Sequence, residues 1–328
     1  MPHSDSCRYD YQFDPDGNDT GAWVIRLTGR GRRVLELGAG PGSITRHLVD
    51  PGGCDVTALE FDADAVERLK AFCPRVVRGD LNDPAWPAAL PDPAPFDVIV
   101  AADVLEHLYD PWRTLGTMKS MIAPGGHVVV SLPHIAHVAV VAGLLQERFD
   151  YREQGLLDRT HIRFFTIHGM QALFEQAGLS IVAAEFVRRD PEQTEFAEHW
   201  NNLPAEIRSL LSVNPFGTVY QVVVKAAPSE AVERALSLID STPDGSSARR
   251  LSGWHDGLPT DPLAGFFEAR QQAEELSDEL RGREREIDAL RAQLARHDEE
   301  LRAMRDSTSW KIGAPIRWLA RVRDFFWR

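Results

Sequence analysis

Cysteine is scarce in this sequence, and long apolar runs are missing from it. The three cysteines, Cys7, Cys54 and Cys73, form no CxxC pair, which argues against a zinc site or a disulfide framework and favours reduced thiols. The longest apolar run, residues 138–145, is far shorter than the roughly 20 residues that span a bilayer. The first residues lack the basic region and apolar core of a secretory signal, so we expect a cytoplasmic protein.

An excess of positive charge is also missing. Lysine and arginine number 36 against 49 aspartates and glutamates, which gives a formal net charge of −13. A chain this acidic is repelled by nucleic-acid phosphates, and we expect no nucleic-acid partner. The composition is otherwise that of a soluble protein, with 43% apolar and 26% charged residues. The length of 328 residues suits one large domain with an appendage.

Apolar segments typical of buried strands alternate with helical patterns in the first two thirds of the chain. Helical patterns cover 63–72, 111–121 and 166–178, and Thr166 is the expected N-cap of the last of them. The expected strands are 34–37, 56–60, 76–80, 96–103, 127–133, 180–187 and 218–226. This alternation predicts an α/β domain over residues 1–228, with a Rossmann-like, seven-stranded, mostly parallel sheet and helices on both faces.

The first expected strand runs directly into three glycines in the segment VLELGAGPG, residues 34–42. Glycines let the chain turn sharply and let a ligand approach the backbone. The spacing differs from the GxGxxG of dinucleotide sites, because Ser43 occupies the third small position. A carboxylate at Glu36 would repel a pyrophosphate and attract a cation. The pattern therefore favours a cationic ligand over a dinucleotide.

This segment resembles the first motif of the class I methyltransferases, which use S-adenosylmethionine. The resemblance continues in acidic residues at the next strand ends, although Asp80 or Asp103 alone is as easily a helix N-cap. It implies that Glu60 binds both ribose hydroxyls and that Asp80, with the backbone of Leu81, binds the adenine amino group. The implied cofactor-binding residues are Glu36, Gly38, Gly40, Gly42, Glu60, Phe61, Asp80, Leu81 and Asp103.

Three further segments narrow the resemblance: SLPHIAH (131–137), QERFDY (146–151) and GLLDRTHIRFFT (155–166). They are similar to a branch of the class found with bacterial cell-surface glycan enzymes and close to methionine-biosynthesis-type methyltransferases, except that His134 stands where that branch has asparagine. The branch implies O-methylation of a sugar hydroxyl of a cell-surface polysaccharide or its precursor. Two alternatives stay open: a small-metabolite methyltransferase, and a non-catalytic scaffold with a vestigial methyltransferase fold.

An alcohol acceptor must lose a proton, and histidine is the usual base near neutral pH. His161 is the first candidate, with Asp158 as its orienting carboxylate; a purely structural hydrogen-bond cluster is the alternative for this pair. His134 is a further catalytic candidate and, with His137, is expected in the acceptor cleft. His107 is expected to pack near the cofactor. Because no HxH or HExxH spacing is present, no metal site is predicted.

The pattern changes after residue 228. Residues 229–264 are rich in Pro, Gly and Ser and are interpreted as a linker. Residues 265–306 show apolar positions at seven-residue intervals, which predicts a coiled coil and a homo-oligomer, with a single solvated helix as the alternative. The apolar seam consists of Ala273, Leu276, Leu280, Ile287, Leu290, Leu294, Leu301 and Met304.

The last segment, residues 307–328, combines aromatic and basic side chains. Rings beside arginines suit a helix that lies at a membrane surface. Its first part, STSWKIGAPIR, resembles a terminal motif of bacterial polysaccharide-assembly enzymes. We expect this tail to hold the protein at the inner surface of the cytoplasmic membrane or in a polysaccharide-assembly complex. Docking on another subunit is the alternative.

Overall fold

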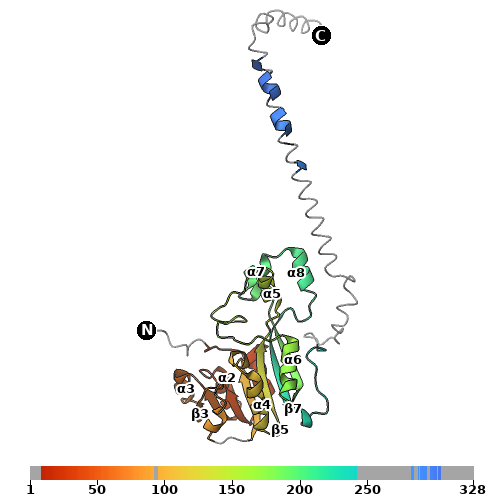
Figure 1. Cartoon of the computed structure of the whole chain (residues 1–328). Coiled ribbons are helices and arrows are strands. Elements are labelled where there is room, and N and C mark those ends of the chain that lie inside the picture. Colours follow the sequence, from red (N-terminus) through yellow and green to blue (C-terminus); the bar gives the residue numbers. More distant parts are fainter. Residues whose placement is uncertain are drawn as a thin grey trace, which may run out of the picture. The chain divides into compact units, whose positions relative to one another are not determined.

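The computed structural model describes residues 9–91 and 95–241, and in the C-terminal part residues 282–283, 287, 289–293, 296–300 and 302–303. The chain divides into two units, Met1–Leu251 and Ser252–Arg328. The first unit is an α/β domain (Figure 1), and the described residues of the second are helical. Within the described ranges, no helix is both long enough and apolar enough to cross a membrane.

A seven-stranded sheet forms the centre of the first unit. Its strands are β1 (Arg33–Leu37), β2 (Asp55–Glu60), β3 (Arg75–Arg78), β4 (Phe96–Ala102), β5 (Ile122–Pro133), β6 (Leu179–Arg188) and β7 (Val219–Pro228). They lie in the order β3-β2-β1-β4-β5-β7-β6, and β7 alone runs antiparallel to the other six. The predicted fold class is confirmed. Because the strand order reverses between β1 and β4, their carboxyl ends flank the crevice where open α/β sheets bind ligands.

Helices cover both faces of this sheet. Residues of α1, α2 and α3 pack with Val34 of β1 in one apolar cluster, whereas residues of α4 and α6 pack with Leu35 and Leu37 in another. Since successive side chains of a strand point to opposite faces, Glu36 points to the face of Val34. The five helices are α1 (Thr20–Thr28), α2 (Ser43–Val49), α3 (Ala63–Leu69), α4 (Pro111–Ser120) and α6 (Ile167–Gln176).

Side-chain caps determine where several of these helices begin. Thr166 accepts a hydrogen bond from the backbone N of Gly169 at 3.1 Å, as an N-cap of α6. Asp62 caps α3 in the same way, accepting from the backbone N of Ala65 at 2.8 Å. Such a cap stabilises a helix by about 1 kcal/mol. With Asp62 as cap, only two residues separate the end of β2 from the start of α3, so the turn between them lies at the carboxyl edge of the sheet.

A group of short helices that the sequence pattern did not predict gathers at one end of the sheet, as Figure 1 shows for α5, α7 and α8. Phe196 and Trp200 are buried between them. The segment from α5 to α6, residues 145–166, carries two of the branch motifs. The remaining elements are α5 (Val138–Leu144), α7 (Ala197–Asn201), α8 (Ala205–Leu211), η2 (Trp86–Ala89), η3 (Leu105–His107), η4 (Pro191–Gln193) and η5 (Ser229–Ala231).

Only a few of the residues in the predicted linker, coiled coil and tail are among those that the structure describes. Leu238 is fully buried on the core of the first unit, so the start of the predicted linker 229–264 packs on the domain. Ile287 and Leu290 of the seam are helical and 47% and 57% exposed. The other seam residues and the tail 307–328 lie outside the described residues. The coiled coil and the tail stay predictions.

Candidate functional site

Three glycines turn the chain between β1 and α2. Gly38 and Gly42 have positive φ angles of 63° and 94°, in a region that favours glycine. A Cβ on Gly42 would lie 2.3 Å from Cζ of Phe72, and a Cβ on Gly38 would lie 2.7 Å from Cγ2 of Val104. Both the backbone conformation and the close packing therefore require glycine, which explains the GxGxG motif in structural terms.

Glu60 ends β2, and its carboxylate holds this glycine loop. Oε2 accepts from the backbone N of Gly40 at 2.7 Å, and Oε1 accepts from the backbone N of Phe61 and of Asp62, both at 2.8 Å. A carboxylate has about four lone-pair sites, so three of them face backbone donors. Binding both hydroxyls of a ribose, as predicted for Glu60, requires one of these backbone bonds to open.

A cavity of about 310 Å³ lies beside the loop, at the small end of the range for ligand sites. Its lining consists of Gly38, Leu59, Glu60, Phe61, Gly79, Asp80, Leu81, Asn82, His107, Leu108 and Tyr109. Five predicted cofactor-binding residues thus converge on one cavity: Gly38, Glu60, Phe61, Asp80 and Leu81. His107 also lines it, next to the predicted cofactor residues. The other four predicted residues, Glu36, Gly40, Gly42 and Asp103, do not contribute to its lining.

Two of those four carry carboxyl groups, buried in Glu36 and half-buried in Asp103. Glu36 is 3% exposed, and burial and then the charge of Glu60 raise its pKa to about 8. Asp103 has a positive φ of 53°, unusual for a residue with a side chain. Its Oδ1 accepts from Oγ of Ser131 at 2.7 Å and from Nε2 of Gln221 at 2.9 Å. Gln221 comes from β7, and no local pattern pointed to it.

Glu106 is a functional candidate that sequence reasoning missed. It lies in η3, is fully buried, and neither carboxylate oxygen has a hydrogen-bond partner in the described part of the chain. Burial and then the charge of Asp103 raise its pKa well above the usual value. Nε2 of His161 lies 3.9 Å from Oε1, and the rings of His107 and His161 are 4.8 Å apart. The one signal in the sequence was an acid within the apolar segment VLEHL.

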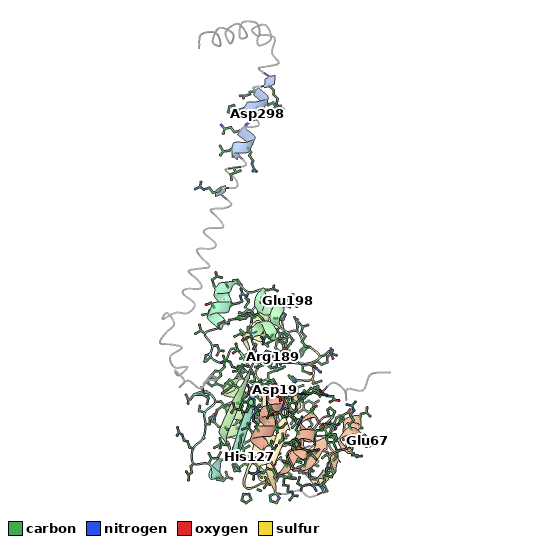
Figure 2. All side chains as sticks on the ribbon, turned by 180° about the vertical axis from the view of Figure 1, so that it is seen from behind. Asp19, Glu67, His127, Arg189, Glu198 and Asp298 are labelled. Atoms are coloured by element: carbon green, nitrogen blue, oxygen red, sulfur yellow. The ribbon has the colours of Figure 1, made fainter. Side chains whose placement is uncertain are left out.

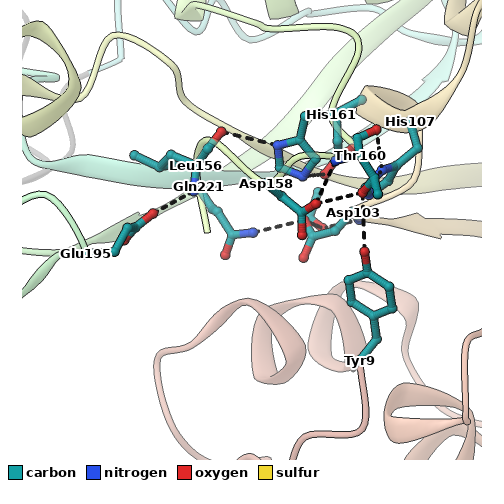
Figure 3. Close-up of polar contacts among 11 residues, drawn as sticks. Tyr9, Asp103, His107, Leu156, Asp158, Thr160, His161, Glu195 and Gln221 are labelled. Atoms are coloured by element: carbon teal, nitrogen blue, oxygen red, sulfur yellow. Dashed lines mark hydrogen bonds and ion pairs between the residues drawn. The ribbon is translucent and has the colours of Figure 1, made fainter. Parts of the chain in front are cut away.

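Hydrogen bonds orient both imidazoles of this cluster, as Figure 3 shows. Nδ1 of His161 lies 3.2 Å from the carbonyl oxygen of Leu156, and Nδ1 of His107 lies 3.1 Å from the carbonyl oxygen of Thr160. A carbonyl only accepts, so each Nδ1 carries the proton and donates it, and in the neutral ring Nε2 keeps the lone pair. Oδ1 of Asp158 accepts from the backbone N and the hydroxyl of Thr160. Asp158 and His161 therefore belong to one cluster, and the orienting role of Asp158 stays a prediction.

His134 and His137, the other predicted cleft residues, each hold two segments of backbone together. Nδ1 of His134 donates to the carbonyl oxygen of Val219 at 3.1 Å, and burial lowers the pKa of His134 to about 4. Nε2 of His137 donates to the carbonyl oxygen of Arg189 at 2.8 Å. A pKa of about 4 makes His134 a weak base, so this geometry favours a structural role for it; the catalytic role remains untested.

A profile of the family described as methyltransferase domain matches residues 18–184, which span the glycine loop, the cavity and the histidine cluster. The chain belongs to this family. The methyl donor of these methyltransferases is S-adenosylmethionine. The assignment of single residues of this methyltransferase domain to the cofactor stays a prediction.

Individual relatives are similar over parts of their length. The ubiquinone biosynthesis O-methyltransferase of Pectobacterium carotovorum is 30% identical over 103 residues, which are 31% of this chain and 43% of that protein. The 27-O-demethylrifamycin SV methyltransferase of Amycolatopsis mediterranei is 28% identical over 182 residues, 53% of this chain and 64% of that protein. The chain therefore spans less than two thirds of these relatives. A crystal structure of a methyltransferase from Archaeoglobus fulgidus is 16% identical, with a TM-score of 0.43, covering 63% of this chain and 94% of that one.

The residues at the cavity suit S-adenosylmethionine, which supplies a methyl group on a positively charged sulfur. Glu36 lies outside the lining, but its Oε2 is a buried acceptor with no hydrogen-bond partner among the described residues, and such an acceptor favours a hydrogen-donating or cationic group nearby. Phe61 lines the cavity and is 62% exposed, so its ring is available to a flat aromatic base. Oδ1 of Asp80 accepts from the backbone N of Asn82, which holds the carboxylate at the cavity.

Proposed function

We propose that this chain transfers the methyl group of S-adenosylmethionine to a hydroxyl oxygen of a glycan or glycan precursor. The observation that carries this proposal is a row of neighbouring rings that passes the cavity at His107 and ends in exposed rings, Tyr9 at one end and Tyr151 at the other. Successive ring centroids are separated by 6.4 Å (Tyr9–His107), 4.8 Å (His107–His161), 6.5 Å (His161–Phe164), 5.6 Å (Phe164–Phe149) and 5.4 Å (Phe149–Tyr151).

The outer end of this row suits an acceptor with both apolar and polar faces. Phe149 and Phe164 are each 37% exposed and Tyr151 is 54% exposed. Aromatic rings bury apolar surface, and a tyrosine hydroxyl adds a polar contact. A sugar ring presents C–H groups on one face and hydroxyls at its rim, so it matches such a surface. The three rings come from the QERFDY and DRTHIRFFT segments, which also carry the resemblance to glycan-modifying methyltransferases.

The reaction requires no covalent bond between the protein and the transferred methyl group. The hydroxyl oxygen forms a bond to the methyl carbon while the carbon–sulfur bond breaks, and the hydroxyl proton leaves. The chain must hold the acceptor in line with the methyl group and exclude water. Its cluster of Glu106, His107 and His161 lies next to the cavity lining through His107, and it is the place where the proton would leave.

A small-molecule acceptor is the second candidate function. The named relatives act in ubiquinone biosynthesis and on 27-O-demethylrifamycin SV, and both names specify O-methylation or an O-demethylated substrate. They support an oxygen acceptor for this chain and do not favour a polysaccharide. We keep the glycan as first candidate because of the exposed ring row.

The test uses methyl-labelled S-adenosylmethionine and the fractionated extract of the host. We expect label in the glycan or glycolipid fraction, in a form that resists mild base as an ether does. Label confined to small molecules would replace the glycan by the second candidate. The variant Phe164→Leu should raise the acceptor KM by about 2- to 10-fold through the lost ring contact and leave the cofactor Kd unchanged. Leu210→Ala, at an exposed apolar residue of α8, is the control and should change neither constant.

The tail and the coiled-coil segment suggest where the chain acts. We propose that the chain works at the cytoplasmic face of the membrane, held there by residues 307–328, and that residues 265–306 join copies of it. Truncation after Ser241, which keeps the buried Leu238, should then leave activity on a soluble acceptor intact but lower glycan methylation in cells.

A further inference from the structure

Glu106, His107 and His161 form a cluster of three groups that can each donate an electron pair; Glu106 and His161 are buried and His107 is half-buried. One ligand atom of each residue lies within 4.8 Å of those of the other two. The two histidines are separated by 54 positions in the sequence, so no spacing motif reveals the set. The expectation of no metal site rested on the absence of such motifs and does not address this arrangement.

The described residues donate no hydrogen bond to the carboxylate of Glu106. It is fully buried, and both of its oxygens are without a hydrogen-bond donor among the described residues. The distance of 3.9 Å to Nε2 of His161 is too long for a hydrogen bond. An uncompensated buried charge is destabilising by several kcal/mol. Asp103 and Asp158 add negative charge nearby, which increases the attraction for a cation.

The orientation of both rings fits metal ligation. Each Nδ1 donates to a backbone carbonyl oxygen, of Leu156 for His161 and of Thr160 for His107. Metal-binding histidines usually donate their second N–H in this way, which fixes the ring and leaves Nε2 as the ligand. Two such nitrogens and a carboxylate in one place repel one another unless a proton or a metal cation lies between them.

We propose that Glu106, His107 and His161 bind a divalent first-row transition-metal ion, of the class of Mn²⁺, Fe²⁺, Co²⁺ or Zn²⁺. Two imidazoles and one carboxylate suit these ions better than Mg²⁺ or Ca²⁺, which prefer oxygen ligands. Two ligand atoms about 2.1 Å from one ion lie at most about 4.2 Å apart. The cluster is slightly wider than that at its limit of 4.8 Å, so small side-chain rotations close it.

The ion has a role in methyl transfer that rests on the proposed function. Three protein ligands leave positions open, and His107 also lines the cavity. An acceptor hydroxyl bound to the ion has a lowered pKa and loses its proton to water. Its oxygen then bonds to the methyl carbon as the carbon–sulfur bond breaks, and the electron pair stays on sulfur. With Nε2 on the ion, His161 is a ligand and not the base predicted from the sequence.

The test measures metal binding directly and needs no acceptor. Full-length protein is stripped with a chelator and titrated with Co²⁺, which is followed by its visible absorption, and the metal content of the protein as purified is measured. We expect one ion per chain. His107→Gln, His161→Gln and Glu106→Gln should each weaken Co²⁺ binding by at least about 100-fold, since removal of second-shell partners alone gives 10- to 100-fold.

Two features keep this experiment decisive. Glu106→Gln replaces a fully buried carboxyl group that has no hydrogen-bond partner among the described residues by an uncharged group of the same shape, so the metal-free variant should be at least as stable as the wild type. His127→Gln is the matched control: this buried histidine of β5 (labelled in Figure 2) pairs with Val98 near the amino end of β4, whereas Glu106 and His107 follow the carboxyl end of that strand. This variant should bind Co²⁺ as the wild type does. No Co²⁺ binding by the wild type up to millimolar concentration, or equal loss in His127→Gln and His161→Gln, would overturn the proposal. Co²⁺ binding without glycan methylation would reject the proposed function and leave the metal site standing.

Discussion

Replacing Glu60 by glutamine should separate the role of its charge from that of its shape. Three backbone N–H groups of the loop and of the turn before α3 donate to this carboxylate. The amide of glutamine has one acceptor oxygen, and its NH2 group faces N–H donors that it cannot satisfy. The loss of one charge-assisted hydrogen bond amounts to about 1.5–3 kcal/mol. We therefore expect the Kd for S-adenosylmethionine to rise about 10- to 150-fold in Glu60→Gln.

Isothermal titration calorimetry at 25 °C measures this Kd, and a thermal melt shows whether the variant is folded. Glu67→Gln is the control: this residue of α3 has a side chain that is 71% exposed and is paired with Lys70 (Figure 2), and exposed pairs contribute little. Its Kd should equal that of the wild type. If folded Glu60→Gln bound the cofactor with the wild-type Kd, the reasoning that Glu60 organises the cofactor loop would be refuted.

The other predictions concern the folding of the cofactor region without ligand. The pKa of Glu36 in the folded chain is about 8, so between about pH 4.5 and 8 the folded state keeps a proton that the unfolded state has lost, and stability falls as pH rises through this window. In urea unfolding, the stabilisation by Glu36→Gln should therefore be larger at pH 9 than at pH 5, by up to a few kcal/mol. Equal effects at both pH values would contradict this reasoning. Gly40→Ala and Gly42→Ala share a positive φ and its strain of about 1–2 kcal/mol, but only the Cβ at position 42 meets Phe72. The free energy of unfolding should therefore fall by about 1–3 kcal/mol more in Gly42→Ala, and the reasoning fails if the two variants unfold alike.

The alternation of apolar strands and helical patterns was sufficient to predict the central sheet. Each of the seven strands overlaps the predicted segment, and α6 begins after the predicted cap Thr166. These features are local, since burial on both faces leaves a continuous apolar run and a cap needs one side chain. The short helices α5, α7 and α8 were missed, because their burial depends on contacts with one another and not on a long amphipathic period. The packing of Leu238 on the core was missed for the same reason.

The cofactor region could be anticipated for a further physical reason. Parallel strands end at one edge of the sheet, so residues at their ends or just after them, such as Glu60 and Asp80, lie at that edge. The cavity lining bears this out for Gly38, Glu60, Phe61, Asp80 and Leu81. The positions of Glu36 and Asp103 outside that lining depend on side-chain direction and on the αL backbone of Asp103, which the sequence pattern does not specify.

The sequence by itself determined the family and the sheet, and it predicted the edge at which ligands bind, because these follow from periodicity and from a short glycine motif. Only the tertiary structure brought Glu106 and His107 to His161, Gln221 to Asp103, and Phe149 to Phe164. These contacts join residues from separate loops and strands, and a single chain carries no local period that relates them. Burial makes Glu106 a candidate ligand, since a carboxylate that is stable in water requires a proton or a cation inside a protein.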